Sequence, residues 1–188
     1  MNDVKNFGLY DSTFEKSSCG VGFLTRKDGK QTHELLVKGH EALCAVPHRG
    51  GMSAEGVGDG AGVSIDLSVT FFSRVVGTSL VAGEFGVGNF FLPNNKSQHG
   101  RAKKLIDDAL KSEGMVTLIT RSVDVDNSVL RPAAIKYQLP IAQWVFAAPK
   151  GIRGAALEKR IHKALLSIES EAYIDEDLDG MYPLSMSS

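Results

Sequence analysis

Near the start of the chain a cysteine stands directly before two alternating glycines and an apolar run, in the sequence SSCGVGF (residues 17–23). Cys19 fits two interpretations: a small buried hydrophobe at the start of a strand, or a nucleophile that becomes the first residue of a shortened chain. Cleavage between Ser18 and Cys19 would place an α-amino group, with an ordinary pKa of about 7.7–8.0, beside the sulfur as its general base. For an isolated cysteine the packing interpretation is the commoner one.

Two further clusters follow, PHRGG (residues 47–51) and GVGDGAG (residues 56–62). In the first, His48 and Arg49 complement the negative end of a preceding helix, so this cluster alone is typical of a helix stop. The second fits a loose G-x-G-x-x-A spacing, but a helix precedes it and a strand-like run follows, the reverse of a dinucleotide-binding turn. Its glycines instead predict a tight turn with positive φ angles.

The other histidines and the second cysteine offer Cys19 no recognisable partner. No Cys-His-Asn arrangement can be assigned, and no spacing of histidines and cysteines predicts a metal site. Cys44 is expected to be a packing residue on a helix. The four remaining histidines are expected to face solvent from helix surfaces: His33, His40, His99 and His162.

The composition is that of a soluble globular domain, with 188 residues of which 43% are apolar and 23% are charged. A formal charge of −1 gives no electrostatic case for binding nucleic acid or an anionic membrane. No apolar stretch is long enough to span a bilayer, and the first residues lack the apolar core of a secretory signal. We therefore expect a cytoplasmic protein whose two cysteines are free thiols.

The elements that must position these clusters are strand-like and helix-like runs in succession. Helix cover on two sides of the strands favours a layered α/β or α+β domain. Runs of β-branched and aromatic residues bounded by Gly, Pro, Asn or Asp predict strands at residues 20–25, 62–67, 87–92, 115–120 and 141–147. Apolar residues every three or four positions predict helices from a Thr32 cap to Pro47, over residues 98–112, and through Leu157, Ile161, Leu165 and Ile168.

Toward the end of the chain, IDEDLDG (residues 174–180) is expected to be a solvated acidic loop, because its carboxylates lack the spacing of a calcium loop. The final residues, MYPLSMSS, have the pattern of a strand that begins without a stop signal, so the domain is expected to be incomplete there. A truncated sheet would expose an unpaired edge strand, which predicts self-association or pairing with a companion chain.

Taken together and in order, the three clusters resemble one family. LYDSTFEKSSCGVGF is similar to the beginning of the glutamate synthase large subunit, where a short propeptide ends before the nucleophilic cysteine. ALCAVPHRGG and GVGDGAGVSIDL are similar to that family's next block, and EFGVGNFFLP, DNSVLRPAA and LEKRIHKALLSIE match its order and spacing. From about Gly8 to the last residue, the chain is identified as a member of the class II glutamine amidotransferases.

The resemblance implies a fold and an organisation. The expected fold is α+β, the N-terminal-nucleophile hydrolase αββα sandwich, incomplete at the C-terminus. Residues 1–18 would be the propeptide and residues 19–188 the N-terminal portion of the amidotransferase domain. The implied enzyme is the glutaminase part of glutamate synthase, which hydrolyses L-glutamine to glutamate and ammonia for glutamate biosynthesis.

The resemblance also implies roles for individual residues. Cleavage at Ser18–Cys19 would make Cys19 the nucleophile and its freed amine the base. The substrate pocket would be lined by Arg49 and Gly50, and the adjacent turn would be formed by Gly58, Asp59 and Gly60.

Cofactors and partners follow from the same resemblance. The family uses FMN and an iron–sulfur cluster at a distant site, and this chain has no sequence to bind either of them or a metal. The implied partners are L-glutamine and the central FMN-binding domains of a glutamate synthase, or a companion chain, with a homo-oligomer as the alternative assembly. Neither nucleic acid nor a membrane is implied.

Two departures from the family leave a second hypothesis open. The family's substrate-binding Arg and Asp and its oxyanion-binding Asn-Gly pair fall beyond the last residue, and loss of oxyanion donors costs about 10²–10³ in rate. LITRSVDVDNS stands where the family usually carries a Gly-Trp-Arg-like segment, with Arg121 retained. The alternative is therefore a catalytically incomplete, amidotransferase-like binding or regulatory module. An unrelated thiol hydrolase would lack a histidine partner.

Overall fold

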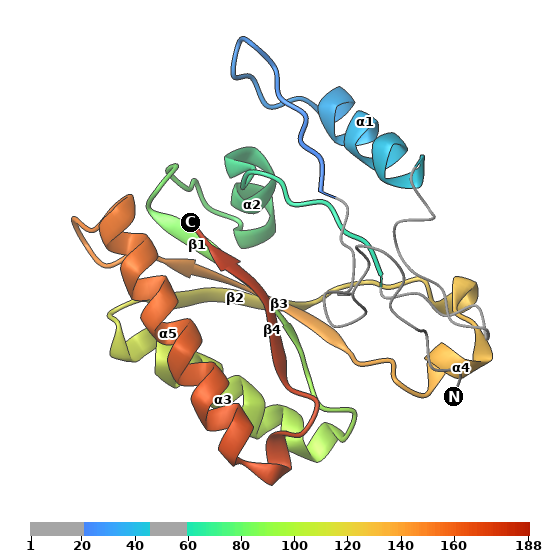
Figure 1. The fold of residues 1–188 in the computed structure, drawn as a ribbon. Coiled ribbons are helices and arrows are strands. Elements are labelled where there is room, and N and C mark those ends of the chain that lie inside the picture. Colours follow the sequence, from blue (N-terminus) through green and yellow to red (C-terminus); the bar gives the residue numbers. More distant parts are fainter. Residues whose placement is uncertain (1–20, 46–59) are drawn as a thin grey trace, which may run out of the picture. The chain divides into compact units, whose positions relative to one another are not determined.

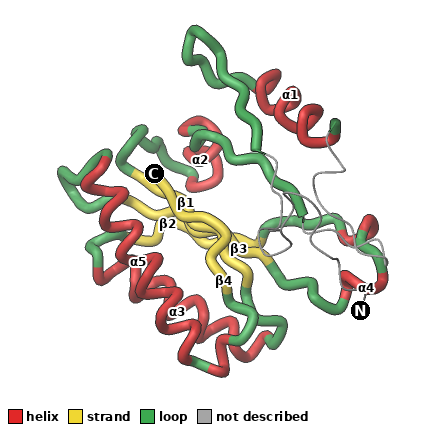
Figure 2. The backbone as a smooth tube through the Cα atoms, viewed as in Figure 1, coloured by secondary structure: helices red, strands yellow, loops and turns green. Residues whose placement is uncertain are grey.

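The computed structural model describes residues 21–45 and 60–188 of the chain. The chain divides into two units, Met1–Ile65 and Asp66–Ser188. Figure 1 shows their helices and strands as ribbons, and Figure 2 colours the same backbone by secondary structure. All the strands of the described residues belong to the second unit.

Helix α1 (His33–Cys44) belongs to the first unit. It begins as the sequence predicts, because the Leu35 N–H donates a hydrogen bond to the Thr32 hydroxyl at 3.3 Å. Glu34 and Lys38 form an ion pair one turn apart on its surface, at 2.8 Å. None of the residues of α1 is buried, so its apolar stripe has no full cover from the described residues.

Two of the predicted strands are wrong. Residues 21–25 and 62–67 are not in strands, and among their apolar side chains Val21 is 95% and Phe23 is 90% exposed. Alternating apolar and polar residues indicate which side chains would share a face, but a strand also needs a neighbour that satisfies its backbone hydrogen bonds. The described residues supply no such neighbour for either segment.

In the second unit four antiparallel strands form one sheet in the order β2-β3-β1-β4. Helix α3 (Lys96–Ser112) follows β1, and helix α5 (Ala155–Ile174) follows β3, and both pack on the same face of the sheet (Figure 1). This βαββαβ order is the split βαβ arrangement, and it confirms the α+β class. The strands are β1 (Phe85–Phe91), β2 (Val116–Ser122), β3 (Ile141–Ala147) and β4 (Tyr182–Ser187).

The remaining sequence predictions of strands and helices in this unit are confirmed. The runs at 87–92, 115–120 and 141–147 correspond to β1, β2 and β3, and the final run is β4. Helix α3 begins where the Asn95 side chain accepts a hydrogen bond from the Ser97 N–H at 3.0 Å, and Gly114, with φ +77°, follows its end. Leu157, Ile161 and Ile168 lie on the buried side of α5, as their spacing predicts.

Helix α2 (Val69–Val76) lies in a segment to which the sequence analysis assigned no element. Its β-branched and aromatic residues are weak helix formers, so its ends matter. Ser68 accepts a hydrogen bond from the Phe71 N–H at 3.3 Å, and Gly77 closes the helix with φ +78°. Three short helical turns complete the unit: η3 (Asn127–Val129), α4 (Pro132–Ile135) and η4 (Glu176–Leu178).

Strand β1 carries glycines where two aromatic rings lie against it. A Cβ atom at Gly86 would lie 2.5 Å from the Phe146 ring, and one at Gly88 would lie 2.7 Å from the Phe90 ring. Phe90 also meets Trp144 edge-on, with ring centroids 5.2 Å apart. These rings are fully buried and form the core beneath α3 and α5.

The opposite face of the sheet is covered in part by α2. Phe72 of this helix packs against Phe85, Val87 and Val145 in a second, smaller apolar cluster. Successive residues of β3 therefore face different cores, since Trp144 belongs to the first cluster and Val145 to the second. The two-sided helix cover that the sequence predicts is present in this unit.

The acidic segment 174–180 is more ordered than the solvated loop that the sequence predicts. Arg101 of α3 forms ion pairs with Asp175 at 2.6 Å and with Asp177 at 3.0 Å. Leu178, in the same turn, is buried in the main core. Arg101 thus holds the acidic turn against α3, and Leu178 of the turn packs into the core.

We predict that Gly86→Ala destabilises the second unit by about 1–3 kcal/mol, because the added Cβ overpacks the Phe146 ring and the Ser187 carbonyl. The matched control is Gly100→Ala in α3, where a Cβ meets nothing within 4 Å. Since alanine favours a helix interior, this control should gain up to about 1 kcal/mol. Urea midpoints at constant m-value measure both; equal shifts of the two variants would refute the packing argument.

Candidate active site

Most of the residues to which the sequence analysis assigns a catalytic or pocket role lie outside the described residues. The structure therefore tests neither their positions nor their proximity. They are Ser18, Cys19, Arg49, Gly50, Gly58 and Asp59. Gly60 is described, together with the segments that lead away from both clusters.

Gly60, the one residue of the predicted glycine turn GVGDG that the structure describes, has a φ of +92°. This left-handed value is one that glycine adopts readily and other residues rarely adopt. A Cβ there would meet nothing within 4 Å among the described residues, so the requirement for glycine that these residues show is conformational. The expectation of a positive φ in the glycine turn is confirmed at this residue.

The segment after Cys19 leads into a tight surface turn. The Gly29 N–H donates to the Arg26 carbonyl at 3.1 Å, and the Arg26 guanidinium binds both carboxylate oxygens of Asp28 at 2.9 Å. The hydrogen bonds from Arg26, and then from the Lys30 N–H, hold the pKa of the Asp28 carboxyl below its usual range. The Asp28 carboxylate therefore stays ionised at neutral pH, and its hydrogen bonds to Arg26 and Lys30 stabilise the turn.

Helix α1 places a second thiol within reach of an imidazole. The Cys44 sulfur lies 3.7 Å from the His40 Nε2 atom, and Cys44 is exposed. The expectation that Cys44 is a packing residue is therefore wrong, because its side of α1 is uncovered by the described residues. Any thiol reagent aimed at Cys19 has this exposed cysteine as a competitor.

The histidines follow the sequence prediction with one exception. His33, His40 and His162 are exposed on helices, as expected. His99 is half-buried, and its Nε2 atom lies 2.7 Å from the Pro93 carbonyl oxygen. It therefore closes the loop before α3 instead of facing solvent.

A row of hydrogen-bonded polar side chains crosses all four strands. The Arg121 Nε–H of β2 donates to the Gln143 Oε1 atom of β3 at 2.8 Å, and the Gln143 amide donates to the Asn89 Oδ1 atom of β1 at 2.9 Å. The Asn89 amide then donates to the Ser185 hydroxyl of β4 at 2.9 Å. We call these four residues the polar row. Gln143 is its most buried member, with 9% of its surface exposed.

Arg121 also has an aromatic partner. Its guanidinium carbon lies 5.7 Å from the centre of the Phe71 ring of α2, within range of a cation–π interaction. In this chain the aromatic ring beside Arg121 thus comes from α2, an element distant from β2 in the sequence. Arg121 is recognisable in the sequence, but its contacts with Phe71 and with the other three residues of the polar row are not predicted from it. The available signal was the single polar residue inside otherwise apolar runs, as in IAQWVFA.

No metal or membrane feature appears in the part of the chain that the structure describes. Across residues 21–45 and 60–188, no group of three or more His, Cys, Asp or Glu side chains is arranged to hold a metal ion. In the same residues no helix combines the length and the apolar character needed to cross a bilayer.

We predict that Gln143→Leu lowers the free energy of unfolding by about 1–3 kcal/mol, because Arg121 and Asn89 each lose a hydrogen-bond partner in a half-buried position. The control is Ser185→Ala at the exposed end of the polar row, which should stay within about 0.5 kcal/mol. Thermal or urea unfolding distinguishes them; a neutral Gln143→Leu variant would show that the row contributes nothing to stability.

Comparisons with known proteins place the whole described part of the chain in one family. The family model described as "Glutamine amidotransferases class-II" matches residues 19–188. Glutamate synthase [NADH] of Saccharomyces cerevisiae is 33% identical over 145 residues, which are 72% of this chain and 7% of that protein. The glutamate synthase [NADPH] large chain of Bacillus subtilis is 33% identical over 142 residues, 74% of this chain and 9% of its own length. Ferredoxin-dependent glutamate synthase 2 of Synechocystis sp. is 32% identical over 155 residues, 80% of this chain and 10% of that protein. The chain thus spans about a tenth or less of these relatives.

Proposed function

The chain belongs to the class II glutamine amidotransferases, and on this premise we propose that it is the glutaminase part of a glutamate synthase. It would hydrolyse L-glutamine to glutamate and ammonia for glutamate biosynthesis. The observation that carries the proposal is the family match from residue 19 to residue 188, which begins at the cysteine suited to be an N-terminal nucleophile.

The proposed reaction uses one residue for two roles. After removal of residues 1–18 as a propeptide, the α-amino group of Cys19 takes the thiol proton, directly or through a water molecule. The thiolate attacks the side-chain amide carbon of glutamine, and the α-ammonium group returns its proton to the leaving nitrogen, so that ammonia departs as the carbon–nitrogen bond breaks and a thioester remains. Water then hydrolyses the thioester and releases glutamate, which restores the thiol.

The two glycine-containing clusters would shape the site around that sulfur. Arg49 and Gly50 would line the substrate pocket, and Gly58, Asp59 and Gly60 would form the turn beside it. The positive φ of Gly60 supports this turn. We further propose that the catalytic fold is an αββα sandwich, for which the α+β class of the described residues is suitable and in which a second sheet would stack beside the first.

Assembly and location form part of the same proposal. Because the chain spans only 7–10% of these relatives, its partners would be the remaining domains of a glutamate synthase, on the same or a companion chain, in the cytoplasm. Self-association is the alternative. The iron–sulfur cluster would belong to those other domains, since a cluster needs about four thiolate ligands and this chain has two cysteines. The family resemblance places FMN at the same distant site.

We predict that the expressed protein matures to a species that lacks Met1–Ser18 and that a glutamine-mimicking diazoketone labels it once, at Cys19. Cys19→Ala should abolish both processing and labelling, because sulfur and amine belong to the same residue. Intact-mass spectrometry before and after labelling measures both events. Maturation and labelling do not depend on turnover, so they remain measurable if the isolated chain releases little ammonia.

The second cysteine is the matched control. Cys44→Ala removes the exposed thiol of α1 and should leave processing and labelling unchanged. A chain that stays full-length, or a label that persists in Cys19→Ala and disappears in Cys44→Ala, would contradict the glutaminase proposal and favour an amidotransferase-like module without catalysis.

A further inference from the structure

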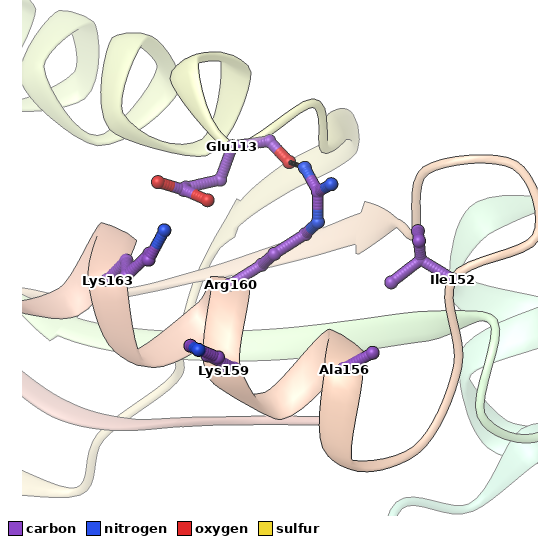
Figure 3. Close-up of a pocket in the computed structure, with 6 residues that line it drawn as sticks. All are labelled: Glu113, Ile152, Ala156, Lys159, Arg160 and Lys163. Carbon is purple, nitrogen blue, oxygen red and sulfur yellow. Dashed lines mark hydrogen bonds between the residues drawn. The ribbon is translucent and has the colours of Figure 1, made fainter.

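A cationic hollow lies between the end of α3 and the first turns of α5. Its volume is about 380 Å³, and Figure 3 shows the side chains around it. Three cations and one carboxylate give it a formal charge of +2. Its lining is Glu113, Ile152, Ala156, Lys159, Arg160 and Lys163. No part of the hollow includes a residue with a proposed role in glutaminase chemistry.

The arginine of this hollow is held in place. The Arg160 Nη1 atom donates to the backbone carbonyl of Glu113 at 2.7 Å (Figure 3). The same nitrogen lies against Gly114, where a Cβ atom would be 3.6 Å from it. This contact also offsets the negative end of the α3 dipole. A fixed, half-buried guanidinium loses little further freedom when it binds an anion.

The two lysines are not held in ion pairs with other described residues, although the Lys163 ammonium lies on the same side of the hollow as the Glu113 carboxylate (Figure 3). Within the described residues neither Lys159 nor Lys163 forms an ion pair. They stand four residues apart on α5, and like charges at this spacing repel each other. Helix α5 also begins at Gly154 with no side-chain cap, so its positive end adds to the same potential. Positive charge gathered in this way is compensated when an anion binds.

We propose that this hollow is a binding site for a small dianionic oxyanion. The charge of the ligand would be met by Lys159, Arg160 and Lys163, and the apolar wall of Ile152 and Ala156 would contact a short carbon skeleton. A short dicarboxylate and inorganic phosphate can both carry this charge. Only the dicarboxylate has a carbon skeleton that can contact Ile152 and Ala156.

The single carboxylate of the lining gives the proposal a distinctive test. The backbone of Glu113 holds Arg160, whereas its side chain adds a negative charge to the hollow. Glu113→Gln therefore removes repulsion without removing the hydrogen bond to Arg160. We expect this variant to bind an anion about threefold to tenfold more tightly. If the lysines only form a solvated surface without an anion site, Glu113→Gln should not increase the affinity for an anion.

The experiment is an NMR titration of the full chain with glutarate and with inorganic phosphate at low ionic strength. We expect saturable shifts of the Lys159, Arg160 and Lys163 signals, and about tenfold weaker binding in the double variant Lys159→Gln/Lys163→Gln. The control with the same change in net charge is Lys103→Gln/Lys136→Gln, at exposed lysines outside the hollow. It should bind as the parent does.

Each outcome has a defined meaning. Tighter binding of glutarate assigns the site to organic acids, and tighter binding of phosphate assigns it to the inorganic ion. Absence of saturable shifts with both probes, equal weakening in the control variant, or no gain in Glu113→Gln overturns the proposal. Because the site shares no residue with the glutaminase proposal, failure of one leaves the other standing.

Discussion

The second unit depends on two positions of its central strand that carry no side chain. Strand β1 lies between β3 and β4, and its helix-facing residues Gly86 and Gly88 leave the backbone bare. The rings of Phe146 and Phe90 occupy that space, and this lets Trp144 reach the helix layer, where its indole N–H donates to Asp107 of α3 at 3.0 Å. Larger residues in β1 would separate the sheet from both helices. The βαββαβ order brings the strands together, but the glycines set how closely the layers pack.

Much of the second unit can be predicted from the sequence because its signals are local. Each element is indicated by residues close together in the chain. Asn95 caps α3, apolar residues every three or four positions indicate α5, and a short bounded apolar run indicates β3. The α+β class then follows from their order. Helix α2 was missed because phenylalanines and valines favour strands, although Ser68 and Gly77 mark its two ends.

Features that join distant segments could not be predicted in the same way. The polar row links four strands that are up to 96 residues apart in the chain, and the Phe71 contact with Arg121 joins two elements. The strand predictions for residues 21–25 and 62–67 are wrong for a related reason. Alternation of apolar and polar residues predicts which side chains share a face, but it does not show that a neighbouring strand is present. The assignment of Cys19 and its pocket depends on recognising several motifs in order, because each motif alone has an ordinary structural explanation.

The polar row has a direction that one residue imposes. A guanidinium can only donate hydrogen bonds, so Gln143 must turn its oxygen toward Arg121 and its nitrogen toward Asn89. Asn89 is oriented in the same way, with its oxygen toward Gln143 and its nitrogen toward Ser185, whose hydroxyl oxygen accepts the last hydrogen bond of the row. The oxygen and nitrogen of a side-chain amide can exchange places by a flip of the group. A row of amides alone could therefore run its hydrogen bonds in either of two directions. Here a single permanent charge at one edge selects one of them across the full width of the sheet.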